Sequence, residues 1–242
     1  MNRTLEHILP RVQKPARYTG GEYNAVVKDR RAVDVRYALC FPDTYEIGMS
    51  NLGVRILYGL MNEMDGVWCE RVFAPWGDME EEMRREGIPL YGLESGDSIA
   101  DFDLIGFSLG YEMAYTNVLN MLDLAGLPLR SGERTELSPI VVAGGTCAFN
   151  PEPLAPFVDL FVLGEGEDVS VEIIQLYRQA REEGWGKEEF LTAAARIPGV
   201  YVPSLYEVSY HGDGTVAAVT PLEGAPARVT KRIVQDLSLI HI

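Results

Sequence analysis

A glycine-rich turn with two carboxylates follows a short apolar run in DLFVLGEGED, residues 159–168. Gly164 and Gly166 allow a ligand to approach the backbone closely, and a strand–glycine turn–helix unit usually cradles a phosphate with its N–H groups. Glu165 and Glu167 in the same turn would repel a phosphate. The turn therefore favours a ligand that carries hydrogen-bond donors, for which carboxylates are acceptors. The alternative is that both glutamates lie in solvent near a helix N-terminus, where acidic side chains are favoured.

Three further segments combine glycines, hydroxyls and acceptors, namely PDTYEIGMSNLG, SLGYEMAYTN and GGTCAFNPEPL, which start at residues 42, 108 and 144. With the first turn they supply the predicted cofactor-binding residues: Asp43, Tyr45, Gly48, Ser50, Asn51, Ser108, Gly110, Gly144, Gly145, Thr146, Gly164, Glu165, Gly166 and Glu167. Purely structural alternatives stay open, because Asp43 could cap a helix, Tyr45 could be a packed aromatic residue and Gly144–Thr146 could form a plain turn.

The sequence shows no arrangement typical of a catalytic centre. Cys40, Cys69 and Cys147 are widely spaced, so they form neither a metal-ligand motif nor a disulfide framework. Unpaired cysteines are typical of a reducing cytoplasm. We therefore predict no catalytic residue and no metal ligand in this chain.

Strand and helix patterns alternate along the chain. Strands are predicted at 33–41, 67–74, 103–110, 139–145 and 159–166, and helices at 51–64, 76–87, 114–126 and 168–184. This alternation predicts a doubly wound α/β domain, flavodoxin-like or Rossmann-like, with a five-stranded parallel sheet. A C-terminal β-hairpin is predicted over 201–221, with its turn near His211–Gly214.

The predicted organisation has four parts: a lead-in segment 1–32, the α/β domain 33–185, a helix plus the β-hairpin over 186–236, and a non-native tail 237–242. The glycine-rich segments all follow predicted strands. Because parallel strands end at one edge of a sheet, we expect these segments to line one crevice, where doubly wound domains bind their ligands.

The composition excludes several classes of partner. A formal charge of −15 disfavours a general nucleic-acid surface or an anionic membrane surface. The first ten residues include polar and charged side chains where a signal peptide would have an apolar core. No apolar run is long enough to span a membrane. We expect a cytoplasmic protein.

The chain resembles the N-terminal region of cobalamin-binding-domain radical SAM proteins over about residues 8–235. The resemblance rests on KPARYTGGEYN, FPDTYEIGMSNLG, DLIGFSLGYEM and GGTCAFNPEPLAPFVDLFVLGEGED. It implies a cobalamin-binding domain followed by a radical SAM barrel, whose Cys-x3-Cys-x2-Cys motif holds a 4Fe-4S cluster that cleaves S-adenosylmethionine. No such motif occurs here. The 4Fe-4S cluster and S-adenosylmethionine are therefore implied only for a missing C-terminal part. That part, the radical SAM barrel, is also the implied partner of this domain.

The resemblance further implies an enzyme that transfers a methyl or other group to an unknown substrate, with no catalysis by this fragment alone. Two alternatives stay open. The domain could be a vestigial scaffold that recruits substrate and binds no corrin. It could also bind flavin for electron transfer, although the loop after the first strand lacks the Ser/Thr-rich phosphate cradle of such domains.

One motif departs from the family pattern. Cobalamin domains that ligate cobalt place a histidine in Asp-x-His-x-x-Gly after the first strand. The same spacing here runs from Asp43 to Gly48 and has Tyr45 at the histidine position. We therefore expect cobalamin to bind without histidine ligation.

Overall fold

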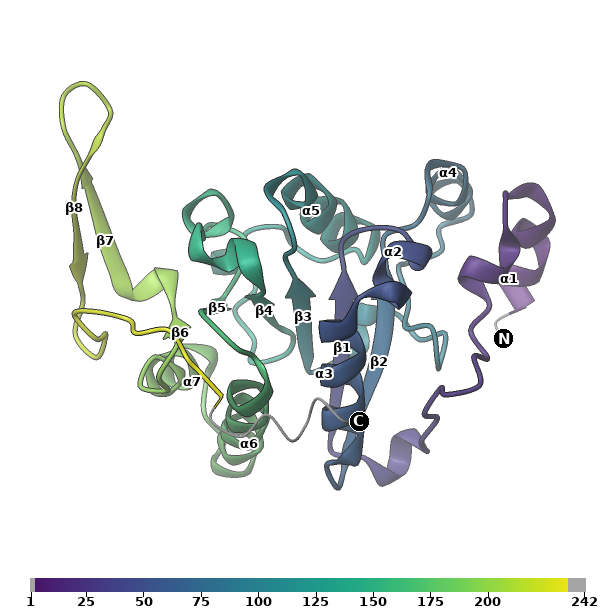
Figure 1. The fold of residues 1–242 in the computed structure, drawn as a ribbon, viewed down its shortest axis with the longest axis horizontal. Helices are drawn as coiled ribbons and strands as arrows, with labels where there is room; N and C mark the ends of the chain where they lie inside the picture. The colour runs from purple at the N-terminus through teal and green to yellow at the C-terminus, as the bar shows by residue number, and fades with distance from the viewer. Residues whose placement is uncertain (1–2, 235–242) are drawn as a thin grey trace.

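The computed structural model describes residues 3–234 (Figure 1). A six-stranded sheet with the order β2-β1-β3-β4-β5-β6 forms its centre. The strands are β1 (Val35–Phe41), β2 (Val67–Phe73), β3 (Leu104–Ser108), β4 (Ile140–Gly144), β5 (Leu160–Val162) and β6 (Val200–Tyr201). The first five pair in parallel and β6 pairs antiparallel with β5. The doubly wound α/β fold is confirmed, but the sheet has six strands rather than the predicted five.

Helices cover both faces of the sheet, each burying an apolar stripe. On one face lie α3 (Leu52–Glu63), α6 (Glu167–Glu183) and α7 (Lys187–Ala194). On the other lie α1 (Arg3–Ile8), α4 (Gly77–Glu86) and α5 (Tyr115–Leu124) (Figure 1). A short helix, α2 (Tyr45–Ser50), joins β1 to α3. The side chain of Asn51 accepts a hydrogen bond from the Val54 N–H at 3.0 Å and caps α3.

The hairpin prediction is correct in type but starts too early. Tyr201 belongs to β6 of the main sheet, and a 3₁₀ turn over Pro203–Leu205 follows it. Pro203 lacks the N–H that a continued strand ladder would need. The hairpin consists of β7 (Tyr206–Tyr210) and β8 (Val216–Pro221). The hairpin projects away from the sheet (Figure 1).

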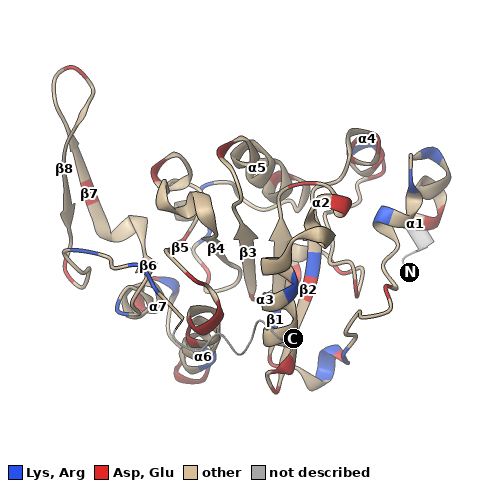
Figure 2. Cartoon of the chain, viewed as in Figure 1, with Lys and Arg blue, Asp and Glu red and all other residues tan. Residues whose placement is uncertain are grey.

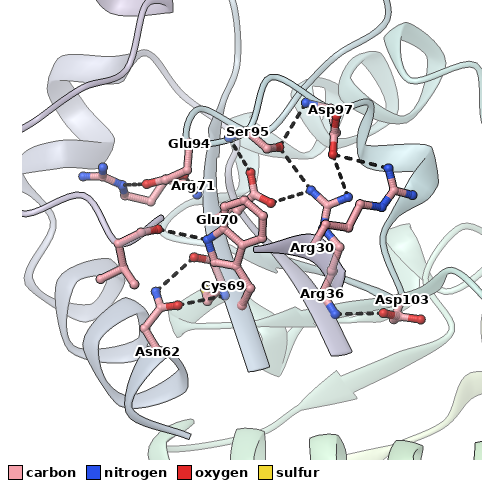
Figure 3. A network of polar contacts seen from close by, with 12 residues as sticks. Arg30, Arg36, Asn62, Cys69, Glu70, Arg71, Glu94, Ser95, Asp97 and Asp103 are labelled. Atoms are coloured by element: carbon pink, nitrogen blue, oxygen red, sulfur yellow. Dashed lines mark hydrogen bonds and ion pairs between the residues drawn. The ribbon is translucent and has the colours of Figure 1, made fainter. Parts of the chain in front are cut away.

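Side chains and one backbone N–H occupy the backbone groups on the outer edge of β2. The amide of Asn62 donates to the Cys69 carbonyl at 3.0 Å and accepts from its N–H at 3.1 Å. The ammonium of Lys28 donates to the Val67 carbonyl at 2.6 Å. Glu94 accepts from the Arg71 N–H at 2.8 Å, and Leu93 N–H donates to the Arg71 carbonyl at 2.9 Å. Figure 3 shows the Asn62 and Glu94 contacts.

A buried ion pair joins β1 to β2. The guanidinium of Arg36 donates to Glu70 at 2.5 Å, and the Glu70 side chain is fully buried (Figure 3). The second carboxylate oxygen of Glu70 accepts from the Ser95 N–H at 2.9 Å. Arg36 also stacks over the Phe102 ring, with its central carbon 4.1 Å from the ring centroid. This cluster fixes the loop around Ser95 against the sheet.

Charges are distributed over many elements. Lys and Arg residues occur on separate helices, strands and loops rather than on one of them (Figure 2). Within residues 3–234, no helix combines the length and apolar character required to cross a bilayer. The boundaries at residues 32, 185 and 236 stay predictions, and the tail 237–242 lies outside the described residues.

Candidate functional site

One face of the sheet is hollowed toward the carboxyl ends of its strands. Along a strand, alternate residues point to the same face. On the face covered by α3 and α6, each of three neighbouring strands proceeds from a large residue to small ones: Leu104–Gly106–Ser108, Ile140–Val142–Gly144 and Leu160–Val162–Gly164. The result is a cavity of about 220 Å³ above the sheet, flanked by the first turns of α3 and α6.

This cavity gathers half of the residues predicted to bind a cofactor. The predicted residues that line it are Ser108, Gly144, Gly145, Gly164, Glu165, Gly166 and Glu167. They come from the ends of β3, β4 and β5, as the parallel sheet requires. Their contribution to ligand binding stays a prediction. The glycines provide space, and Glu165 and Glu167 stand at one end of the cavity, where the Glu165 carboxylate also accepts a hydrogen bond from the Val234 N–H.

The predicted residues that follow β1 lie elsewhere. Asp43 accepts a hydrogen bond from the Tyr111 hydroxyl at 2.9 Å, which links the loops after β1 and β3. Tyr45 donates to Glu22 of the lead-in segment at 3.0 Å, and its ring packs edge-on against Phe73 at a centroid distance of 5.5 Å. Burial, aided by the neighbouring Glu22 carboxylate, raises the pKa of the Tyr45 phenol.

The remaining predicted residues have local roles in the described structure. Gly48 is buried, and an added Cβ would lie 2.2 Å from the Phe73 ring. Ser50 donates to the Ile47 carbonyl at 2.8 Å, and Asn51 caps α3. Gly110 and Thr146 are exposed at the same edge of the sheet, outside the cavity.

The glycine-rich turn after β5 contacts another segment of the chain. Gly164 has a φ of +108°, and a Cβ there would lie 2.1 Å from the Arg232 carbonyl oxygen. That carbonyl accepts from the Glu165 N–H at 3.1 Å, and the Glu165 carboxylate accepts from the Val234 N–H. Gly164 and Glu165 thus hold residues 232–234, which gives this half of the turn a structural role.

Replacing Gly164 with alanine should destabilise the protein, because its φ is unfavourable for a side chain and the Arg232 backbone occupies the space. We expect a loss of about 2–4 kcal/mol in the free energy of unfolding, measured by urea denaturation. Gly184 is the control, since it has a φ of +72° but no atom within 4 Å of an added Cβ. An equal loss for Gly184→Ala would show that the close contact contributes nothing.

Sequence reasoning missed the other residues that line the cavity, and three of them matter most for its shape and polarity. Tyr37 on β1 and Ser170 on α6 are 5% and 8% exposed, and Gly106 on β3 lies directly beneath the Tyr37 hydroxyl. Tyr37 stands in a strand whose residues are all buried, so the sequence pattern predicts a core residue there and not a cavity residue. The signal that could have revealed the cavity is the decrease in side-chain size at alternate positions of β3, β4 and β5.

Exposed apolar side chains stand on the segments that follow three strands at the same edge. They follow β1, β3 and β4, and Met113 is 82% exposed; the set is Ile47, Leu52, Tyr111, Met113 and Phe149. Their exposure leaves apolar side chains at the edge of the sheet where the strands end. We call these five residues the apolar rim.

The cavity favours neutral ligands with hydrogen-bond donors over phosphates. Its lining within residues 3–234 includes Glu165 and Glu167 and contains no lysine or arginine. No group of three His, Cys, Asp or Glu side chains in this part of the chain is arranged to hold a metal ion. Cys40 and Cys69 are buried, and burial raises the pKa of both thiols.

Comparisons with known proteins identify relatives. Residues 53–203 match the family model described as "Radical SAM proteins, N-terminal". An uncharacterised protein of Methanocaldococcus jannaschii is 28% identical over 140 residues, which cover 57% of this chain and 26% of that protein. The chain thus spans about a quarter of the curated relative it matches.

A solved structure also aligns with the chain. It is the radical S-adenosylmethionine methyltransferase TsrM from Kitasatospora setae, with a tryptophan substrate and a SAM analog bound. The sequence identity is 16% and the TM-score is 0.43, over 81% of this chain and 31% of TsrM.

Proposed function

The chain belongs to the family of N-terminal regions of radical SAM proteins, and from this premise we propose that it is a cobalamin-binding domain. The observation that carries the proposal is the cavity at the carboxyl ends of the strands, which is lined by glycines, apolar side chains and acceptors. Doubly wound domains bind ligands at this edge.

The size of the cavity decides which part of cobalamin it suits. Its volume of about 220 Å³ is below the range of whole cofactor sites, so it suits a part of the cofactor smaller than the corrin ring. An apolar cavity of about 150 Å³ accepts a benzene molecule. A two-ring base, such as the dimethylbenzimidazole that cobalamin carries on its nucleotide chain, therefore suits this space.

The corrin ring would lie outside the cavity, against the apolar rim. A flat macrocycle covers exposed apolar groups such as Met113 and Phe149, which otherwise face water. The amide groups around the corrin are hydrogen-bond donors, and Glu165 and Glu167 are acceptors at the mouth of the cavity. In this proposal Gly166 and Glu167 serve the ligand, while Gly164 and Glu165 also hold residues 232–234.

For the whole protein we propose radical chemistry with S-adenosylmethionine and a 4Fe-4S cluster, both held by a catalytic domain that follows this one. The family description supports this assignment. Cobalamin would supply a methyl or other group for transfer, and the present chain would bind and orient it. The cytoplasm is the proposed location, since such a cluster needs a reducing compartment.

The test uses absorption spectra after the protein is incubated with hydroxocobalamin or with flavin mononucleotide and then desalted. We expect retention of the corrin spectrum and no retention of flavin. Retained flavin alone would replace the proposal with an electron-transfer domain. A colourless protein after both incubations would favour a scaffold that binds no cofactor.

Bound cobalamin is expected to lack a nitrogen ligand below the cobalt. The histidines within residues 3–234, His7 and His211, lie in α1 and in the hairpin turn, away from the cavity. A tyrosine such as Tyr45 must lose its proton to bind a metal, and its raised pKa opposes this loss. Electron paramagnetic resonance of the cobalt(II) form should show no nitrogen superhyperfine splitting. Splitting from an axial nitrogen would contradict the expectation, and Tyr45→His tests whether this position faces the metal.

A further inference from the structure

Three hydroxyl groups face the cavity without a partner. Those of Tyr37, Ser108 and Ser170 line it, and none forms a hydrogen bond with any residue between 3 and 234. Tyr37 and Ser170 are more than nine-tenths buried. The hydroxyl oxygens themselves are open to the cavity, since none of them is among the fully buried polar atoms that lack a partner within residues 3–234. A ligand that displaces water from the cavity therefore has to offer these hydroxyls hydrogen-bond partners. Their position in one cavity indicates a ligand with polar atoms at its edge.

The Tyr37 hydroxyl is held over the floor of the cavity. It stands above Gly106, where an added Cβ would lie only 1.9 Å from the phenolic oxygen. Only a glycine at this position leaves room for the hydroxyl. Burial raises the pKa of Tyr37, so the phenol keeps its proton and is a donor throughout the physiological range.

We propose that Tyr37 is a specificity-determining residue whose hydroxyl donates a hydrogen bond to the unprotonated ring nitrogen of the base carried by the corrin. This inference rests on the proposed function. When the base leaves the cobalt, its ring nitrogen regains a free lone pair, which needs a donor in an apolar environment. Corrinoids whose lower base is a phenol have no such nitrogen. The domain should therefore prefer corrinoids with a benzimidazole base.

The proposal has a consequence for stability. The Tyr37 hydroxyl makes no hydrogen bond within the described protein, so Tyr37→Phe should leave the free energy of unfolding unchanged or increase it. Tyr58 lies on the same face of the sheet, and its hydroxyl accepts from the Val26 N–H at 2.6 Å. Tyr58→Phe is the matched control, and it should lower stability without changing corrinoid affinity.

The experiment measures the dissociation constants of cobalamin, of cobinamide, which lacks the base, and of a cobamide with a p-cresol base. For Tyr37→Phe we expect cobalamin to bind about three- to tenfold more weakly. Binding of cobinamide and of the p-cresol cobamide should change less than about twofold, since neither presents a nitrogen to the hydroxyl.

Each other outcome overturns the proposal in a distinguishable way. Equal weakening for all three corrinoids would assign Tyr37 a structural role only. Unchanged cobalamin affinity would show that the base does not contact the hydroxyl. If the unmodified protein binds cobinamide as tightly as cobalamin, the base lies outside the cavity while the proposed function stands. If it binds no corrinoid, the proposed function fails as well.

Discussion

Gly144→Leu is expected to weaken cobalamin binding strongly while the protein stays folded. Gly144 ends β4 and lines the cavity, and an added Cβ would meet only Val162 at an ordinary distance of 3.6 Å. The leucine side chain would therefore extend into the cavity and exclude the base. Burying an aromatic group of this kind contributes about 3 kcal/mol, so affinity should fall by roughly 100-fold. Absorbance titration with hydroxocobalamin measures the loss.

The matched control is Gly77→Leu at the start of α4. Gly77 has no atom within 4 Å of an added Cβ and lies on the opposite face of the sheet, so the variant should bind cobalamin like the unmodified protein. Full affinity in Gly144→Leu would place the base elsewhere. A lower unfolding midpoint in this variant would indicate strain and direct the test to Gly144→Ala.

Glu70→Ala should lower the free energy of unfolding by about 3–5 kcal/mol. The variant removes the buried carboxylate that pairs with Arg36, and the guanidinium stays charged and buried. The Arg36 side chain is only 5% exposed, and the partner that remains, Asp97 at 2.9 Å, lies nearer the surface. Urea denaturation with an unchanged m-value would measure this loss of stability.

Two further variants test whether the lost stability comes from the buried ion pair or from any substitution of a charged residue. The double variant Arg36→Met, Glu70→Leu removes both charges and should recover most of the lost stability. Glu80→Ala breaks a partly exposed pair with Arg84 and a hydrogen bond from Asn120, and it should cost only about 1 kcal/mol. A cost for Glu70→Ala as small as for Glu80→Ala would show that water reaches Arg36 in the folded protein.

The sequence predicts the parallel strands well because their signals are local. Apolar runs such as residues 67–73 end at glycines, prolines or polar turns, and helical spacing follows each run. The sixth strand was missed because Val200–Tyr201 contains only two residues. Its pairing depends on the chain returning to β5, where the Leu163 N–H donates to the Gly199 carbonyl at 2.7 Å. No local pattern encodes this return.

The candidate site was predictable only where strands end. Ser108 and Gly144 follow directly from the parallel order, since adjacent strand ends must meet at one edge. The direction of Tyr45 depends instead on Glu22, which is 23 residues away in sequence. Tyr37 could not be found from the sequence, because the position of its hydroxyl depends on Gly106 in a different strand. Contacts between distant segments therefore decide which hydroxyl groups reach a cavity.

The side chains along β2 have a consequence for association between molecules. An exposed edge strand normally offers unpaired N–H and C=O groups to which another chain can add, and this is a route to aggregation and fibrils. Here Asn62, Lys28 and Glu94 already occupy those groups from Val67 to Arg71. A second molecule would have to displace these contacts before it could extend the sheet, so this edge discourages intermolecular strand addition.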